Sequence, residues 1–275
     1  MAAEDLLPRL HRAYADAEMR GWDFSMLDGR LQAEDPPWDF EADCLVALRR
    51  AGRASRAGEP GRAGEPGRAG EPGRAADLGT GGGERVLRLL ADLPAGERPE
   101  LTATEGWPPN LPVATENLAP HEVPVLAYDA EKGDPLPFAD ASLDLIMCRH
   151  EAVDLAEVAR VLAPGGVFLG QQVDGRDAQE LRDWFGGEPQ YPHVRLEVDR
   201  QAALDAGLVV DGAEEWSGVM VFTDVEALVT YLALVPWDVA DFHVDDQADQ
   251  LQRLADQAPI QVTQRRFRLS AHQPA

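Results

Sequence analysis

The sequence predicts an α/β protein built on a single, mostly parallel sheet of seven strands with helices on both faces. Short apolar runs alternate with segments of helical periodicity from residue 74 onward, as expected for successive strand and helix units. A glycine-rich turn joins the first of these runs to the first helix. The 275 residues, 44% of them apolar, suffice to fill the core of one such domain.

These runs predict the elements in chain order. Strands are expected at 74–78, 101–105, 123–127, 143–148, from 167 onward, 208–216 and 265–270. Helices are expected at 84–93, 154–162, 194–206, 224–235 and 247–257, the last two as a helical insertion before the seventh strand. The helix at 154–162 should stop at Pro164-Gly165-Gly166, because glycine and proline end helices.

The turn after the first strand has glycine at positions 79, 81 and 83, preceded by Asp77. A dinucleotide-binding turn would need glycine where Glu84 stands, which weakens that interpretation. Glycine lets the backbone approach a ligand closely. An acidic residue suits a positively charged ligand, whereas it would repel a pyrophosphate. The turn therefore predicts a site for a cationic, nucleotide-type cofactor at the carboxyl edge of the sheet.

Two more acidic residues follow the next strands. Glu105 ends the second predicted strand, where one carboxylate can accept hydrogen bonds from both hydroxyls of a ribose. Asp129 follows the third strand, and Leu136-Pro137-Phe138 precedes the fourth. We therefore expect Glu105 to hold the ribose of the cofactor.

In this order the motifs resemble those of class I S-adenosylmethionine-dependent methyltransferases, which have a Rossmann-like fold. The resemblance includes the Asp77 to Gly83 turn, Leu136-Pro137-Phe138, and the segment Arg160 to Gly166. It implies S-adenosylmethionine as the cofactor, with Asp129 at the adenine amino group. The residues expected to bind the cofactor are Asp77, Gly79, Thr80, Gly81, Gly83, Glu105, Gly106, Trp107, Asp129, Ala130 and Arg149.

A more local resemblance, to an uncharacterised bacterial branch of the type 11 methyltransferases, has three parts. They are Thr104 to Asn110, Arg149-His150-Glu151, and Gln171-Gln172-Val173. That branch implies no assigned substrate. We expect a small-molecule acceptor, with RNA or protein as the alternative. A non-catalytic S-adenosylmethionine-binding regulatory protein is a further alternative.

The candidate catalytic residues are His150 and Glu151, which follow the fourth strand. Histidine is largely neutral near neutral pH, so His150 could serve as a general base, and Glu151 could orient it or bind a polar acceptor. The alternative is that both residues hydrogen-bond the loop after the strand or line the cofactor site.

Charge and composition limit the partners. The chain has 25 basic and 49 acidic side chains, a net charge of -24, which makes nucleic acid an improbable partner. Cys44 and Cys148 are too few for a disulfide framework, and the histidines have no metal-binding spacing, so no metal site is predicted. We expect no membrane-spanning run and no signal segment. We therefore expect a cytoplasmic protein; the oligomeric state is left open.

Three regions are expected along the chain. Residues 1–51 should form an N-terminal helical lid, and residues 52–74 a flexible loop of repeats with the sequence Arg-Ala-Gly-Glu-Pro-Gly. Residues 75–275 should form the methyltransferase domain, with a cap inserted at about 217–259.

Overall fold

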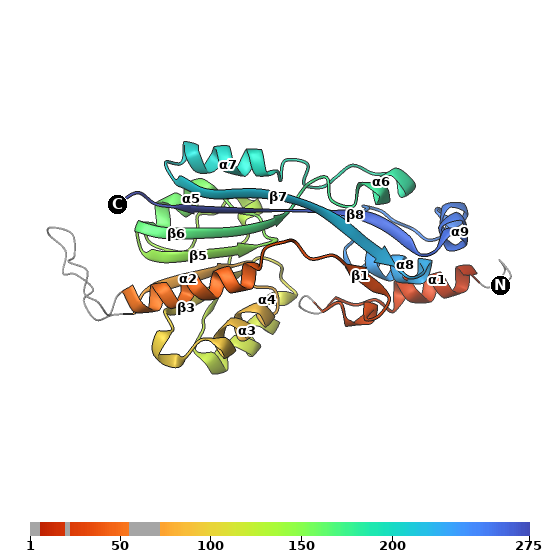
Figure 1. Cartoon of the computed structure of the whole chain (residues 1–275). Coiled ribbons are helices and arrows are strands. Elements are labelled where there is room, and N and C mark those ends of the chain that lie inside the picture. Colours follow the sequence, from red (N-terminus) through yellow and green to blue (C-terminus); the bar gives the residue numbers. More distant parts are fainter. Residues whose placement is uncertain (1–5, 20–22, 55–71) are drawn as a thin grey trace. The chain divides into compact units, whose positions relative to one another are not determined.

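The computed structural model describes residues 6–19, 23–54 and 72–275 (Figure 1). The chain divides into two compact units. The first comprises Met1–Pro37, Val173–Arg195 and Glu215–Arg266, and the second comprises Trp38–Gln172, Leu196–Glu214 and Phe267–Ala275.

Eight strands form a sheet with the order β1-β7-β8-β6-β5-β2-β3-β4. Their bounds are β1 Leu31–Ala33, β2 Arg74–Leu78, β3 Glu100–Glu105, β4 Val125–Ala127, β5 Leu143–Arg149, β6 Leu162–Val173, β7 Val209–Phe222 and β8 Ile260–His272. Strand β2 pairs in parallel with β3 and with β5, as do β3 with β4 and β5 with β6. The predicted α/β fold with a mostly parallel sheet is confirmed.

The predicted number of seven strands is wrong, because β1 is an eighth. It pairs antiparallel with the end of β7, Leu31 lying opposite Phe222. A strand of three residues contains too little alternation of apolar and polar side chains to be recognised in the sequence. Its existence depends on the partner strand, which lies far away in the chain.

Helices cover both faces of the strands in the second unit (Figure 1). One layer consists of α2 (Phe40–Ala54), α3 (Glu84–Asp92) and α4 (Asn110–Leu118), and the other of α5 (Leu155–Val161) and α7 (Leu196–Asp205). Alternate residues of β5 face the two layers, because side chains alternate along a strand. Leu145 and Met147 pack in the core that contains α2 and α3, whereas Ile146 and Cys148 pack in the core that contains α5.

The end of α5 differs from the prediction. Asp154 caps the start of this helix by accepting hydrogen bonds from the N–H groups of Ala156 and Glu157. The helix ends at Val161, and β6 begins at the next residue, so Pro164-Gly165-Gly166 lie within the strand rather than in a turn before it. The register between β5 and β6 shifts here, and Gly165 adopts a φ of 76°. Glycine therefore allows an irregular strand at this position rather than ending the helix.

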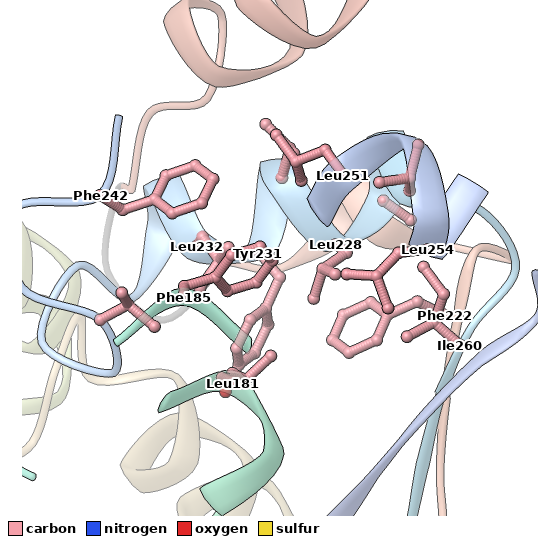
Figure 2. Close-up of a cluster of buried hydrophobic side chains, with 14 of the residues drawn as sticks. Leu181, Phe185, Phe222, Leu228, Tyr231, Leu232, Phe242, Leu251, Leu254 and Ile260 are labelled. Carbon is pink, nitrogen blue, oxygen red and sulfur yellow. The ribbon is translucent and has the colours of Figure 1, made fainter. Parts of the chain in front are cut away.

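The first unit is built around α8 (Val225–Leu234), a mostly apolar helix in which eight of the ten residues are buried. Around it lie α1 (Leu6–Ala15), α6 (Gln179–Phe185) and α9 (Ala248–Gln257). Figure 2 shows Leu181 and Phe185 of α6 and Leu251 and Leu254 of α9 packed with the α8 side chains. The two helices predicted before the last strand are thus present as α8 and α9. Short 3-10 turns occur at Ser25–Leu27, Ala95–Glu97, Ala119–His121 and Ala130–Lys132.

The predicted regions relate to the two units as follows. Residues 6–37 belong to the first unit and residues 38–54 to the second, so the segment expected as a lid contributes to both. The ends of the expected repeat loop are helix and strand, because α2 continues to Ala54 and β2 begins at Arg74. Residues 55–71 lie outside the described residues. The roles of lid and cap stay predictions.

Candidate active site

The predicted site residues lie at, or shortly after, the carboxyl ends of strands in the second unit, and these ends lie along one edge of the sheet. Strand β2 lies between β5 and β3, and these strands are parallel. The strand order therefore reverses at the β2 and β5 pair, which is the position where open α/β sheets bind ligands. The fold brings the glycine turn after β2, Glu105 at the end of β3, and the residues after β5 to this edge.

The glycine turn has a backbone that requires glycine. Gly79, Gly81 and Gly83 have φ values of 65°, 64° and 89°, in the left-handed region where a side chain is strained. The N–H of Thr80 donates to the carbonyl of Thr104 in β3 at 2.9 Å, and the turn ends at the start of α3. The turn is thus pinned to the neighbouring strand.

Glu105 ties the glycine turn to the end of β3. Its Oε2 accepts a hydrogen bond from the N–H of Gly81 at 2.6 Å, and its Oε1 accepts one from the N–H of Trp107 at 2.8 Å. The side chain is buried, and burial raises the pKa of Glu105. A carboxylate can accept about four hydrogen bonds, so acceptor capacity is left for hydroxyl donors. Trp107 is 42% exposed beside this carboxylate.

Asp77 pairs with a cation of the chain itself. It is fully buried and forms an ion pair with Arg85 of α3. Burial raises the pKa of Asp77 and the adjacent Arg85 guanidinium opposes that rise, while the Asp77 carboxylate raises the pKa of Arg85 against the effect of burial. The Arg85 guanidinium also lies over the ring of Phe40, 5.6 Å from its centroid. Sequence reasoning missed Arg85, although an arginine on the apolar face of a helix is itself a signal of a buried ion pair.

Asp129 and Ala130 lie close to Glu105 because β4 pairs with β3. The N–H of Tyr128 donates to the carbonyl of Glu105 at 3.1 Å. Gly106 packs against this segment, and a Cβ at Gly106 would lie 2.7 Å from the carbonyl oxygen of Tyr128. The Asp129 carboxylate accepts a hydrogen bond from the N–H of Glu131 and lies 3.1 Å from the ammonium of Lys132.

Glu151 covers the glycine turn. Its side chain is packed so tightly on Gly79 that a Cβ there would lie 2.6 Å from Glu151 Oε2. Burial, followed by the negative charge of Glu105, raises the pKa of Glu151 to about 7. Glu151 therefore changes its protonation state near neutral pH, as expected of a group that accepts a proton during a reaction. Arg149, at the end of β5, acts electrostatically on Glu41 and Asp77.

His150 is joined to β6 by two hydrogen bonds. The backbone N–H of His150 donates to the backbone carbonyl of Gln171 at 2.8 Å. The ring Nε2 of His150 lies 3.2 Å from Nε2 of the Gln171 side chain. Gln171 also accepts a hydrogen bond from Trp38 Nε1 at 2.6 Å. His150 has a φ of 58°, which is uncommon for a residue with a side chain. Sequence reasoning noted the Gln171-Gln172-Val173 segment but did not connect it with His150.

Among the residues that the structure describes, no helix is long and apolar enough to cross a membrane. The same part of the chain contains no group of three or more His, Cys, Asp and Glu side chains arranged to hold a metal ion.

Comparison with known families matches residues 76–170 to a methyltransferase domain. This range contains the glycine turn, Glu105, Asp129 and the segment from Arg149 to Glu151, and it ends one residue before Gln171. Comparison with curated proteins finds no match.

Several solved structures share the fold. A Bacillus halodurans C-125 protein provisionally described as a methyltransferase is 17% identical, with a TM-score of 0.52 over 74% of this chain and 93% of that one. The YcgJ protein of Bacillus subtilis is 20% identical, with a TM-score of 0.51 over 74% and 92%. A Deinococcus radiodurans R1 protein of unknown function is 17% identical, with a TM-score of 0.50 over 98% and 99%. At these identities the similarity concerns the fold alone.

Proposed function

We propose that this S-adenosylmethionine-dependent methyltransferase transfers a methyl group to a small-molecule acceptor. The observation that carries the proposal is the meeting of three features at the reversal of strand order. These are the left-handed glycine turn, the buried carboxylate of Glu105, and Glu151 packed over Gly79. The cofactor and the acceptor would meet beside Glu151.

The residues present fit S-adenosylmethionine. Glu105 accepts two backbone hydrogen bonds and retains acceptor capacity for the two ribose hydroxyls. Glu105, Glu151 and Asp129 together make the site negative, since the charges of Glu105 and Asp129 both raise the pKa of Glu151. A negative site favours a cofactor that carries an ammonium and a sulfonium group. When bound, this cofactor supplies a methyl group that is already activated for transfer.

The protein's own contribution would be alignment and control of protons. The glycine turn and Glu105 would hold the cofactor in one orientation, which converts the reaction into one between two positioned groups. Where the methyl-accepting molecule has to lose a proton, Glu151 would receive it. The pKa of Glu151, about 7, lets this carboxyl hold a proton reversibly near neutral pH.

The net charge favours a small-molecule acceptor over RNA. A net charge of -24 repels a phosphate backbone. A protein acceptor and a non-catalytic regulatory role are the remaining alternatives. Measured turnover distinguishes an enzyme from the regulatory role, because a regulatory protein would bind S-adenosylmethionine without producing S-adenosylhomocysteine.

Calorimetry with the purified full chain tests the proposal. We expect binding of both S-adenosylmethionine and S-adenosylhomocysteine, weakened in Glu105→Ala. Glu116→Ala, an exposed residue of α4, serves as the matched control. Incubation with methyl-labelled cofactor and pools of small metabolites, RNA or protein should then transfer label to the small-molecule pool. Absence of cofactor binding, or label in RNA or protein alone, would contradict the proposal.

A further inference from the structure

Three side chains form a chain of hydrogen bonds behind the candidate active site. Trp38 Nε1 donates to Gln171 Oε1 at 2.6 Å, and Gln171 Nε2 lies 3.2 Å from His150 Nε2. All three residues belong to the second unit. Trp38 precedes α2, His150 follows β5, and Gln171 is in β6. Residues that are distant in sequence are thus linked by two consecutive side-chain contacts.

The chemistry of these groups determines where the protons lie. An indole N–H can only donate, so the atom of Gln171 that faces Trp38 is the carbonyl oxygen. The amide NH₂ group of Gln171 therefore faces His150 and donates to its Nε2. A ring nitrogen that accepts a hydrogen bond carries no proton, so the neutral imidazole has its proton on Nδ1.

We infer that Trp38 and Gln171 are positioning residues, which hold His150 as a neutral imidazole protonated on Nδ1. The lone pair of Nε2 is then occupied by Gln171, and His150 acts as a hydrogen-bond donor rather than as the base that the sequence predicts. The role of His150 in a reaction rests on the proposed function, whereas the position of the proton on its ring does not. Within the pair of His150 and Glu151, the proton acceptor is Glu151.

The surroundings hold this arrangement in place. Gln171 is 5% exposed, and its backbone carbonyl accepts a hydrogen bond from the backbone N–H of His150. The Arg268 guanidinium lies over the Trp38 ring, 5.1 Å from its centroid, and is itself paired with Asp43 and Glu214. Rotation of the Gln171 amide would set its NH₂ group against the indole N–H, two donors facing each other. Trp38 therefore disfavours the His150 tautomer that is protonated on Nε2, and it does so by fixing the orientation of the Gln171 amide.

Nitrogen-15 NMR of the histidine rings tests the tautomer in the full chain without cofactor. His150 is assigned from the signal that is lost in His150→Gln. We expect the wild-type ring to carry its proton on Nδ1. In Trp38→Phe the amide is free to rotate, so the tautomer protonated on Nε2 should appear. In Gln171→Glu the carboxylate can only accept, so Nε2 should be protonated throughout.

The control is Trp184→Phe, which makes the same change in the first unit and should leave the His150 signals unchanged. Two results would overturn the inference: a proton on Nε2 in the wild-type protein, or an unchanged tautomer in both Trp38→Phe and Gln171→Glu. Signals of the other histidines report whether a variant is folded, and Gln171→Glu provides the answer if Trp38→Phe does not fold.

A kinetic comparison tests the role once an acceptor is known. Glutamine can donate a hydrogen bond but cannot act as a base, so His150→Gln should retain turnover within about 10-fold, whereas loss of a general base lowers it by ~10²-fold or more. A fall of that larger size in His150→Gln would overturn the donor role. Failure of the proposed function would instead be seen as absence of S-adenosylmethionine binding in the wild-type protein, with the tautomer unaffected.

Discussion

Replacing Glu151 with glutamine should stabilise the protein without cofactor, and the gain should grow as the pH rises. The folded protein raises the pKa of this carboxyl from its ordinary 4.5 to about 7, through burial and then through the charge of Glu105. Above the ordinary pKa the unfolded chain readily ionises Glu151, while the folded protein retains the proton. The folded state thus binds more protons, and its stability falls as the pH rises from 4.5 to about 7.

The pKa difference sets the size of the effect. Each pKa unit corresponds to about 1.4 kcal/mol, so the rise from 4.5 to about 7 makes the penalty of ionised Glu151 at most about 3.5 kcal/mol. Glu151 is partly exposed, and solvent reduces this figure, so we expect a gain of about 1–3 kcal/mol for Glu151→Gln above neutral pH. Near the ordinary pKa the wild-type carboxyl is still protonated in the folded protein, and the gain should approach zero.

Urea unfolding followed by tryptophan fluorescence, at about pH 5 and about pH 8, measures the difference between variant and wild type at each pH. Glu116→Gln is the matched control, because Glu116 is exposed, and its effect should be independent of pH. An effect of Glu151→Gln that is equal at the two pH values, or a loss of stability at the higher one, would refute the reasoning.

Three further results are expected. Glu105→Ala should weaken S-adenosylmethionine binding by about 10-fold or more in calorimetry, because charge-assisted hydrogen bonds are lost, and unchanged affinity would refute the ribose assignment. Binding of this cation near pH 7 should release protons from Glu151, seen as a heat that depends on the buffer's ionisation enthalpy, and the release should vanish in Glu151→Gln. Arg85→Ala should cost about 3–5 kcal/mol of unfolding free energy in urea titration, because Asp77 would remain buried without its cation; a cost below 1 kcal/mol would contradict this pairing.

Local patterns in the sequence predicted the parallel strands and most of the helices. The apolar run that became β5 is recognisable because a strand buried on both faces contains few polar residues. The glycine turn was recognisable because left-handed backbone favours one residue type, which the φ values of Gly79, Gly81 and Gly83 bear out. Placement of Glu105 at the edge of the sheet followed from its position at the end of a strand. The binding roles of these residues stay predictions.

Only the tertiary structure decided which side chains are partners. The three-residue β1 forms because β7 is there to pair with it. Asp77 pairs with Arg85, and Gln171 contacts both His150 and Trp38. Such contacts join residues far apart in the chain, or on opposite sides of a turn, and their energies depend on distance, direction and burial. A sequence pattern contains none of these three quantities, whereas the packing of strands and helices determines all of them.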